Sequence, residues 1–350
     1  MSIDTRIFRI TDNTFDEVIK EASQIIREGG TVAFPTETVY GLGADALNPD
    51  AVLKIFEAKG RPADNPLIVH IADRKQCIEL ALDIPEMASR LMDTFWPGPL
   101  TLILKCKTIV PYITTGGLDT VGLRMPDDRI ALELIRCAGT PIAAPSANRS
   151  GYPSPTTAEH VIQDLEGRID AVIDGGDTNI GVESTVVDVT ANIPVILRPG
   201  YISAEDIEQC AGTVHIGYTD RQITGNESVR SPGMKYTHYS PKADVIMIEG
   251  DFSDVAYAIT GLIAEYYEKG QRVGLLVSDE VARTVSADAT FSLGRGQDPS
   301  QAARSIFMGL RHLDNENMDL IIVDGSITNE GVGTAVFNRL RKAADRIIKI

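Results

Sequence analysis

The sequence predicts an α/β protein built from two domains, on three observations. Apolar segments of strand length alternate with segments of helical periodicity along most of the 350 residues. This length exceeds the usual size of a single domain. Periodicity is lost between about 213 and 243, in a polar stretch too long for a routine connection. We therefore expect one domain over 1–212, a linker or functional loop over 213–243 and a second domain over 244–350.

The first domain is expected to hold a twisted mixed sheet, because several of its strands are short and follow one another through glycine-rich turns. Asn48 is a good N-cap and Pro49 suits the first helical position, so a helix begins there and ends at Gly60. Ser203 caps a last short helix. Other helices are expected at about 13–28, 74–82, 85–95, 128–138 and 157–165, and strands at 31–34, 67–71, 100–105, 121–125, 141–144, 171–174, 184–189 and 195–197.

The second domain restarts the alternation after Asp244. Strands are expected at 245–248, 272–277, 291–293, 320–323 and 347–350, and helices at 253–268, 279–285, 300–313 and 334–344. Regular alternation of this kind indicates a parallel sheet with helices on both faces, a small doubly wound (Rossmann-like) domain. About a hundred residues is a common size for one.

Composition narrows the class of protein. The net charge of −16 and a sequence pI near 4.8 argue against a surface that binds nucleic acid as a whole, and leave room for a local basic pocket. The four cysteines are widely spaced and form no CxxC pair, so we expect free thiols in a reducing compartment. The N-terminus lacks the apolar core of a signal peptide and no apolar run reaches membrane-spanning length, so a cytoplasmic protein without a membrane partner is expected.

The standard nucleotide and nucleophile motifs are absent: neither a P-loop, a GxGxxG after a strand, HExxH nor GxSxG occurs. A phosphate-handling site would therefore use separate cations. Lys59 and Arg61 stand at a helix end beside the Asn65-Pro66 turn, although any helix C-terminus favours cations. Arg124 lies inside an apolar strand and Arg198 at a strand end. For both we favour anion binding over an ion pair with a buried carboxylate.

Several other polar residues allow both a structural and a functional interpretation. Ser146 and Asn148 follow a strand end, where α/β folds place ligand contacts, but both residue types are common in turns. His70, inside a strand, is by itself more often a core histidine. The segment from Glu183 to Thr185 gives a weak signal. Aromatic and basic residues at 235–239 mark either a linker or a functional loop.

Taken together, the motifs resemble the threonylcarbamoyl-AMP synthase family, in the long two-domain form of the YrdC-like proteins. The resemblance covers the whole chain. Its specific part is a split K-x-R…S-x-N pattern, formed here by Lys59, Arg61, Ser146 and Asn148. The matching segments are FPTETVYGLG (34–43), KGRPADNPLIVH (59–70), WPGPLT (96–101), VGLRMPD (121–127), APSAN (144–148), ESTVVD (183–188), LRPG (197–200) and SPGMKYTHYSP (231–241).

The resemblance implies an adenylate-forming reaction. L-Threonine and bicarbonate give a carbamate, which attacks the α-phosphate of ATP to yield threonylcarbamoyl-AMP and pyrophosphate. A separate transferase machinery then modifies tRNA, so stable direct nucleic-acid binding is not expected. Mg²⁺ would be held mainly through the ATP phosphates.

The same resemblance assigns residues, with the four of the split pattern as the catalytic set. Threonine would be bound by Thr38, His70, Arg124, the backbone at Ala144, and Ser184. ATP would be bound by Lys59, Arg61, Asn65, Thr120, Ser146, Asn148, Ser154, Arg198 and a linker tyrosine, Tyr236 in preference to Tyr239. We expect the 213–243 segment to cover the pocket as a lid, because the carbamate and its anhydride hydrolyse readily.

Two other functions stay open at this point. One is a double-stranded RNA-binding module, which the acidity of the chain disfavours. The other is a carbamoyl-adenylate-forming maturation factor with a related domain, but such proteins are larger and carry zinc-binding cysteine pairs that this chain lacks.

Overall fold

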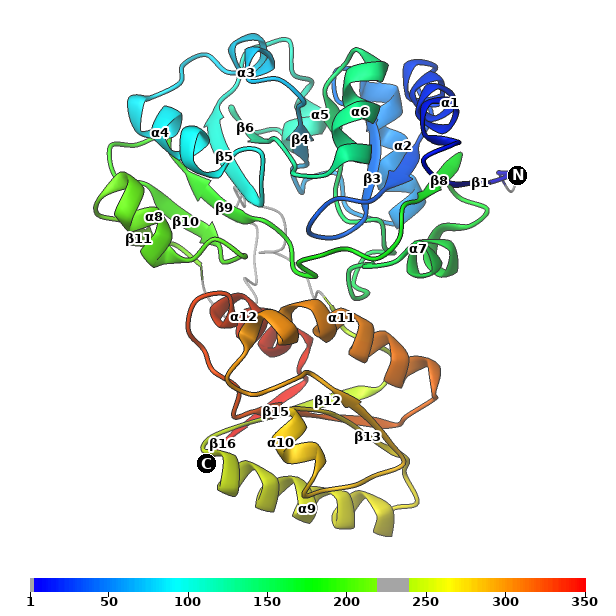
Figure 1. Ribbon diagram of the computed structural model, residues 1–350, viewed down its shortest axis with the longest axis vertical. Coiled ribbons are helices and arrows are strands. Elements are labelled where there is room, and N and C mark those ends of the chain that lie inside the picture. Colours follow the sequence, from blue (N-terminus) through cyan, green and yellow to red (C-terminus); the bar gives the residue numbers. More distant parts are fainter. Residues whose placement is uncertain (1–2, 219–238) are drawn as a thin grey trace.

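The computed structural model describes residues 3–218 and 239–350, and shows two α/β domains with one sheet each (Figure 1). The first sheet has eleven strands in the order β1-β8-β2-β3-β7-β4-β6-β5-β9-β10-β11. Parallel and antiparallel pairs alternate irregularly along it, as the sequence predicted. The strands are β1 (Arg6–Arg9), β2 (Val32–Phe34), β3 (Gly41–Asp45), β4 (Ile68–His70), β5 (Leu100–Lys105), β6 (Thr120–Arg124), β7 (Ile142–Ala143), β8 (Ala171–Asp174), β9 (Thr185–Asp188), β10 (Val195–Arg198) and β11 (His215–Ile216).

Helices cover this sheet and begin where the sequence predicted. The Asn48 side chain accepts hydrogen bonds from the amides of Asp50 and Ala51, and Gly60 ends the same helix with φ 62°. Ser203 forms a capping box with Asp206. The helices are α1 (Phe15–Arg27), α2 (Pro49–Lys59), α3 (Lys75–Leu80), α4 (Glu86–Phe95), α5 (Tyr112–Thr115), α6 (Arg129–Ala138), α7 (Ala158–Leu165) and α8 (Ala204–Ala211).

Strand pleating divides the interior of the first domain into two cores. Val32 and Phe34 of β2 pack with α1 and α6 on one face of the sheet. Ala33, between them, points to the other face and packs with α2 and its neighbours. The sheet around β2 is therefore buried on both sides.

The second domain is a five-stranded parallel sheet in the order β14-β13-β15-β12-β16, which confirms the doubly wound prediction. Helices α11 and α12 cover the face toward the first domain, and α9 and α10 cover the opposite face (Figure 1). The elements are β12 (Asp244–Glu249), α9 (Phe252–Glu268), β13 (Val273–Val277), α10 (Asp279–Ala282), β14 (Ala289–Ser292), α11 (Pro299–Asn315), β15 (Leu320–Gly325), α12 (Gly333–Ala343) and β16 (Arg346–Lys349).

Four elements were not predicted, namely β1, β3, α5 and β11. In β3 the sequence GLGAD has little β-propensity, and the glycine is needed for packing. A Cβ on Gly43 would stand 2.6 Å from the ring of Phe34 on the neighbouring β2. Strand β11 pairs with β10, so the first sheet continues to Ile216, inside the segment expected to be a linker. The division at 212 and 243 stays a prediction.

Apolar side chains, a close backbone approach and a buried ion pair join the two domains. Val39 and Val182 of the first domain belong to the same apolar cluster as the inner faces of α11 and α12. Gly181, with φ +84°, lies so close to α11 that a Cβ would stand 2.4 Å from the carbonyl oxygen of Ala303. Arg311 and Asp164 form a buried ion pair across the boundary at 2.7 Å.

Helices of the described ranges, 3–218 and 239–350, include none with the length and apolar character needed to cross a membrane.

Candidate active site

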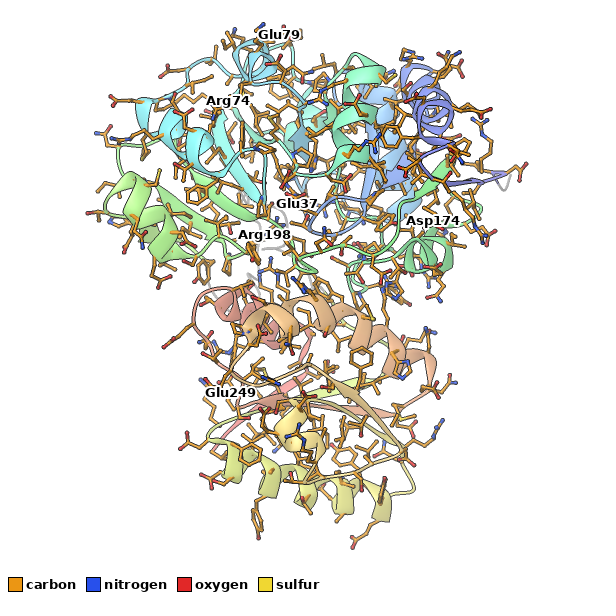
Figure 2. All side chains as sticks on the ribbon, in the orientation of Figure 1. Glu37, Arg74, Glu79, Asp174, Arg198 and Glu249 are labelled. Carbon is orange, nitrogen blue, oxygen red and sulfur yellow. The ribbon has the colours of Figure 1, made fainter. Side chains whose placement is uncertain are left out.

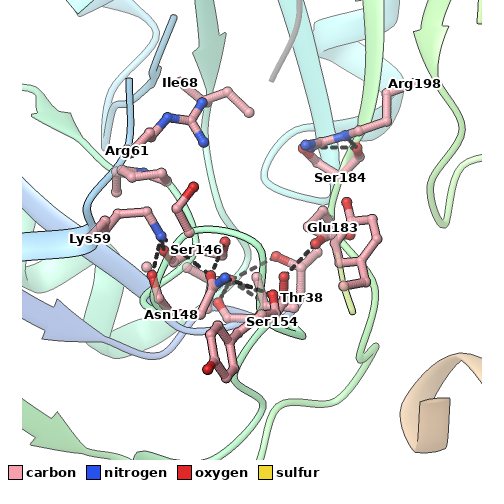
Figure 3. A pocket seen from close by; sticks show the side chains of 18 of the residues that line it. Thr38, Lys59, Arg61, Ile68, Ser146, Asn148, Ser154, Glu183, Ser184 and Arg198 are labelled. Atoms are coloured by element: carbon pink, nitrogen blue, oxygen red, sulfur yellow. Dashed lines mark hydrogen bonds between the residues drawn. The ribbon is translucent and has the colours of Figure 1, made fainter. Parts of the chain in front are cut away.

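A pocket lies among the strand ends of the first domain, near the second domain (Figure 3). Figure 2 shows Glu37 and Arg198 on this side of the first domain, with Glu79 at the far end. The residues that line this pocket include Thr36, Thr38, Val39, Gly41, Lys59, Arg61, Ile68, His70, Arg124, Ala144, Pro145, Ser146, Asn148, Ser150, Gly151, Tyr152, Ser154, Glu183, Ser184, Arg198 and Tyr239. In Figure 3 the residues of the split motif face Ser184 and Arg198 across the pocket.

The split motif forms one end of the pocket. Lys59, in the last turn of α2, donates from Nζ to the carbonyl oxygens of Ser146 (2.6 Å) and Asn148, with Asn148 Oδ1 at 3.4 Å. Gly60 then turns the chain so that Arg61 also lines the pocket, with Nη2 3.3 Å from the carbonyl oxygen of Pro66. Lys59 thus contacts two residues that lie 87 and 89 positions away in the sequence.

Lys59 is a buried cation held by uncharged oxygens. Burial lowers the pKa of its ammonium well below the usual range, and the positive charge of Arg61 lowers it further. Within the residues that the structure describes, no carboxylate lies at ion-pair distance from Lys59. An anionic ligand would supply the missing counter-charge.

The turn after β7 is locked by side-chain hydrogen bonds. Ser146 Oγ donates to Asn148 Oδ1 at 2.5 Å. Asn148 Nδ2 in turn donates to the carbonyl oxygens of Arg149 (2.9 Å) and Tyr152 (2.8 Å). The amide therefore fixes the loop that carries the Lys59 acceptors.

Arg124 occupies the centre of the pocket. Its Nη2 donates to Thr38 Oγ1 at 2.9 Å and lies 2.7 Å from Glu37 Oε2, with both side chains buried. Arg124 therefore forms the ion pair with a buried carboxylate that was the alternative interpretation from the sequence. Its guanidinium also lines the pocket.

His70 lies opposite Arg124, its register partner in the β4–β6 pair. Burial, and then the charge of Arg124, lower the pKa of His70 to about 3. The imidazole is therefore neutral near pH 7, and its ring packs edge-on against Phe34. His70 is thus both a buried core histidine and a residue that lines the pocket.

The other end of the pocket is formed by β9, β10 and the loop before β9. Arg198 donates from Nε (3.1 Å) and Nη2 (2.9 Å) to the carbonyl oxygen of Ser184, and from Nη2 to Ser184 Oγ at 3.1 Å. Burial lowers the pKa of Arg198 to about 10, against the opposing charge of Glu183. Ser154 Oγ donates to Glu183 Oε1 at 2.6 Å.

Two of the described residues assigned by resemblance, Asn65 and Thr120, do not line the pocket. Asn65 is buried in its turn and contacts Arg61 through its backbone carbonyl. Thr120 lines a separate small cavity beside Ile103. Tyr236 lies outside the described residues. Tyr239, its alternative, is buried and lines the pocket, packing on Phe307 of α11.

Sequence reasoning missed several lining residues, among them Ser150 and Tyr152. Both sit in the Pro/Gly/Ser loop that follows the S-x-N motif, and that loop composition was the available signal. Ala144 was assigned through its backbone; its amide donates to Ile68 at 2.9 Å, which leaves its carbonyl for a ligand.

Comparison with known proteins covers both domains. The family model described as "Telomere recombination" matches residues 24–200, and the one described as "Threonylcarbamoyl-AMP synthase, C-terminal domain" matches residues 202–345. The threonylcarbamoyl-AMP synthase of Pyrococcus abyssi (strain GE5 / Orsay) is 50% identical over 99% of this chain and 100% of that protein. The one of Bacillus subtilis (strain 168) is 52% identical over 97% of each.

Solved structures agree with the sequence relatives. The crystal structure of P. abyssi Sua5 complexed with L-threonine superposes with a TM-score of 0.93, at 49% identity over 99% of this chain and 100% of that one. Similarity therefore extends through both sheets and the boundary between them. The chain belongs to the threonylcarbamoyl-AMP synthase family, in its long two-domain form.

Proposed function

We propose that this pocket makes threonylcarbamoyl-AMP and pyrophosphate from L-threonine, bicarbonate and ATP. The observation that supports the proposal is that residues far apart in the sequence meet in one pocket. Of the residues assigned by motif that the structure describes, all but two line one pocket, and they come from segments spread between Thr38 and Arg198. Several cations gathered in one buried site suit a reaction that develops charge on phosphate.

Threonine is proposed to bind around Arg124. The guanidinium would hold the amino acid carboxylate, while the hydroxyls of Thr38 and Ser184 and the carbonyl of Ala144 supply polar contacts. Neutral His70 adds no competing charge. The threonine amine would then form the carbamate with bicarbonate, releasing water.

ATP is proposed to bind with its phosphates at the Lys59 end. A carbamate oxygen attacks the α-phosphate, the bond from that phosphorus to the bridging oxygen breaks, and pyrophosphate leaves. Lys59 and Arg61 would stabilise the added charge, with Ser146, Asn148, Ser154 and Arg198 orienting the nucleotide. No covalent enzyme intermediate is required.

Mg²⁺ is proposed to reach the site with ATP. Among the described residues that line the pocket, the acidic one is Glu183. Its carboxylate already accepts hydrogen bonds from Arg339 and Ser154. The donor set therefore fits a metal held by nucleotide phosphates, and the ion would offset phosphate charge there.

Further expectations follow from this assignment. Cytoplasmic location fits the four cysteines, which are unpaired in the structure. The product is proposed to pass to a transferase that modifies tRNA. A lid over 213–243 is supported by Tyr239, which lines the pocket from its described end. Deleting 231–241 should reduce turnover sharply, and unchanged turnover would contradict the lid.

The test is pyrophosphate release from ATP and Mg²⁺ with each substrate omitted in turn. We expect release to require both bicarbonate and L-threonine, and to be weak with L-serine, which lacks the methyl group. Release that ignores threonine would overturn the proposal. Salt-sensitive binding to duplex RNA without such release would favour the RNA-binding alternative.

A further inference from the structure

The second domain places a fully buried arginine behind the pocket. Arg339, on α12, is 0% exposed. Its Nε donates to Glu183 Oε2 at 3.0 Å and its Nη1 donates to the carbonyl oxygen of Pro199 at 2.6 Å. Both acceptors belong to the first domain. Each adjoins a residue of the pocket, since Ser184 follows Glu183 and Arg198 precedes Pro199.

Glu183 connects this arginine to the pocket. Its carboxylate lines the pocket, whereas Arg339 does not. One carboxylate oxygen accepts from Arg339, and the other accepts from Ser154 Oγ at 2.6 Å. The negative charge that faces the pocket is therefore neutralised from the second domain.

A charged Glu183 needs a cation at this depth. Burial by itself would raise its pKa, but Arg339, followed by Arg198 and the Ser154 hydroxyl, lowers the pKa to about 2. After Arg339, the next cation that lowers the pKa of Glu183 is Arg198. In the structure Arg198 instead directs Nε and Nη2 to Ser184.

We propose that Arg339 is a positioning residue of the active site, which neutralises Glu183 so that Arg198 stays on Ser184 and faces the nucleotide. Loss of Arg339 would leave a buried carboxylate unpaired, which is strongly unfavourable, and Arg198 would turn to it. The nucleotide would then lose one of its cations. This inference rests on the proposed function for the identity of the ligand, ATP.

A purely structural role makes a different prediction. If Arg339 only held the domains together, removing the charge of Glu183 as well would not restore ATP binding, because the contact of Arg339 with the Pro199 carbonyl would still be missing. If Arg339 acts by neutralising Glu183, removing both charges releases Arg198 and restores binding. The double variant therefore separates the two roles, and it also avoids the unpaired charge that could prevent folding.

The experiment measures ATP dissociation constants by calorimetry on the full-length protein, with pyrophosphate release alongside. The variants are Arg339→Gln, Arg339→Gln with Glu183→Gln, and Arg341→Gln. Arg341 is the matched control, because it lies on the same helix but pairs with Glu249 of its own domain at 2.6 Å. We expect the dissociation constant to rise about tenfold in Arg339→Gln, to recover most of that loss in the double variant and to stay unchanged in Arg341→Gln.

The pH dependence of ATP binding gives a second measurement. In Arg339→Gln the pKa of Glu183 rises, so lowering the pH protonates it, releases Arg198 and strengthens ATP binding. Wild-type protein should lack this recovery. Unchanged affinity in Arg339→Gln, or a double variant that binds ATP no more tightly than the single one, overturns the inference. Normal ATP affinity without threonine-dependent pyrophosphate release would instead overturn the proposed function alone.

Discussion

One buried cation lies at the first end of the pocket and another lies behind its second end, and the two are held by opposite means. At the first end, Lys59 is surrounded by carbonyl oxygens of its own domain, and burial lowers its pKa well below the usual range. Behind the second end, Arg339 enters from the other domain and is paired with the carboxylate of Glu183. Burial by itself would lower the pKa of Arg339, but the Glu183 carboxylate and hydrogen bonds to Glu183 and Tyr239 raise it.

This difference separates two tasks. A buried cation without a carboxylate gains most when an anion arrives, so it is suited to bind phosphate. A cation that is already neutralised gains little from a ligand, so it is suited to hold its neighbours in place. We therefore expect substitutions at the first end to reduce the rate most, and substitutions at the second end to act through affinity and domain packing.

Lys59→Ala should have the largest effect. We expect kcat/KM for pyrophosphate release to fall by about 10² to 10³, the loss that follows removal of one preorganised charge donor. Lys54→Ala is the matched control, since this lysine of α2 donates to the Gly29 carbonyl at 2.7 Å and does not line the pocket. Equal activity of the two variants would show that the first end is not where phosphate charge is stabilised.

Acid should destabilise the first domain through His70. The folded pKa is about 3 and the ordinary value is 6.5, so between these pH values the unfolded chain binds the extra proton. The free energy of unfolding should then drop as pH falls, by about 3 kcal/mol on reaching pH 4. Urea titrations of wild type and His70→Gln would measure it. The variant should show a shallower pH dependence, while His215→Gln, at an exposed strand, should match wild type.

Local sequence predicted the first end better than the second. Asn48, Gly60 and the Ser146–Asn148 turn are fixed by capping and turn chemistry, which acts over a few residues. The Arg339–Glu183 pair joins residues 156 positions apart, and no local sequence pattern predicts such a distant partner. In the sequence, Glu183 was therefore only a weak signal within its motif, and Arg339 gave none.

The same distinction explains the errors in the fold prediction. Alternation and caps predicted most helices and strands, including the whole second sheet. Strand β3 was missed because burial between β2 and β7, and not propensity, makes GLGAD extended. Thr120 lies on the same side of β6 as Arg124 and lines a small cavity that shares Ile68 with the pocket, so its assignment to ATP stays a prediction.

Gly181→Ala should disturb the second end without touching a ligand group. A Cβ there would meet the Ala303 carbonyl at 2.4 Å, and φ +84° is itself unfavourable for alanine. We expect a loss of about 1 to 3 kcal/mol in stability, measured by denaturation. Gly176→Ala also has φ +84° but meets no atom within 4 Å, so it isolates the cost of the backbone conformation from that of the clash. Equal losses in both variants would remove the evidence for tight domain packing at Gly181.

The charge state of Lys59 should appear in the pH dependence of ATP binding. Phosphate favours the ammonium form, so affinity should fall as pH rises above the lowered pKa of the free site, by up to about tenfold per pH unit. Lys59→Arg keeps its charge at these pH values and should lose this dependence, whatever its absolute affinity. Calorimetry between pH 7 and about 10 tests both. Parallel curves for the two proteins would mean that Lys59 is not the titrating group.

Asn48→Ala should have the smallest effect and tests how the first end is supported. The Asn48 side chain caps α2 at the opposite end from Lys59, so its loss should cost about 1 kcal/mol of stability. Asn48→Asp keeps an acceptor and should retain most of that stability. We expect KM for ATP to be unchanged in both, because the carbonyls of Ser146 and Asn148 hold the Lys59 ammonium directly. A large rise in KM for ATP in Asn48→Ala would mean that the whole helix, and not its last turn, sets the position of the cation.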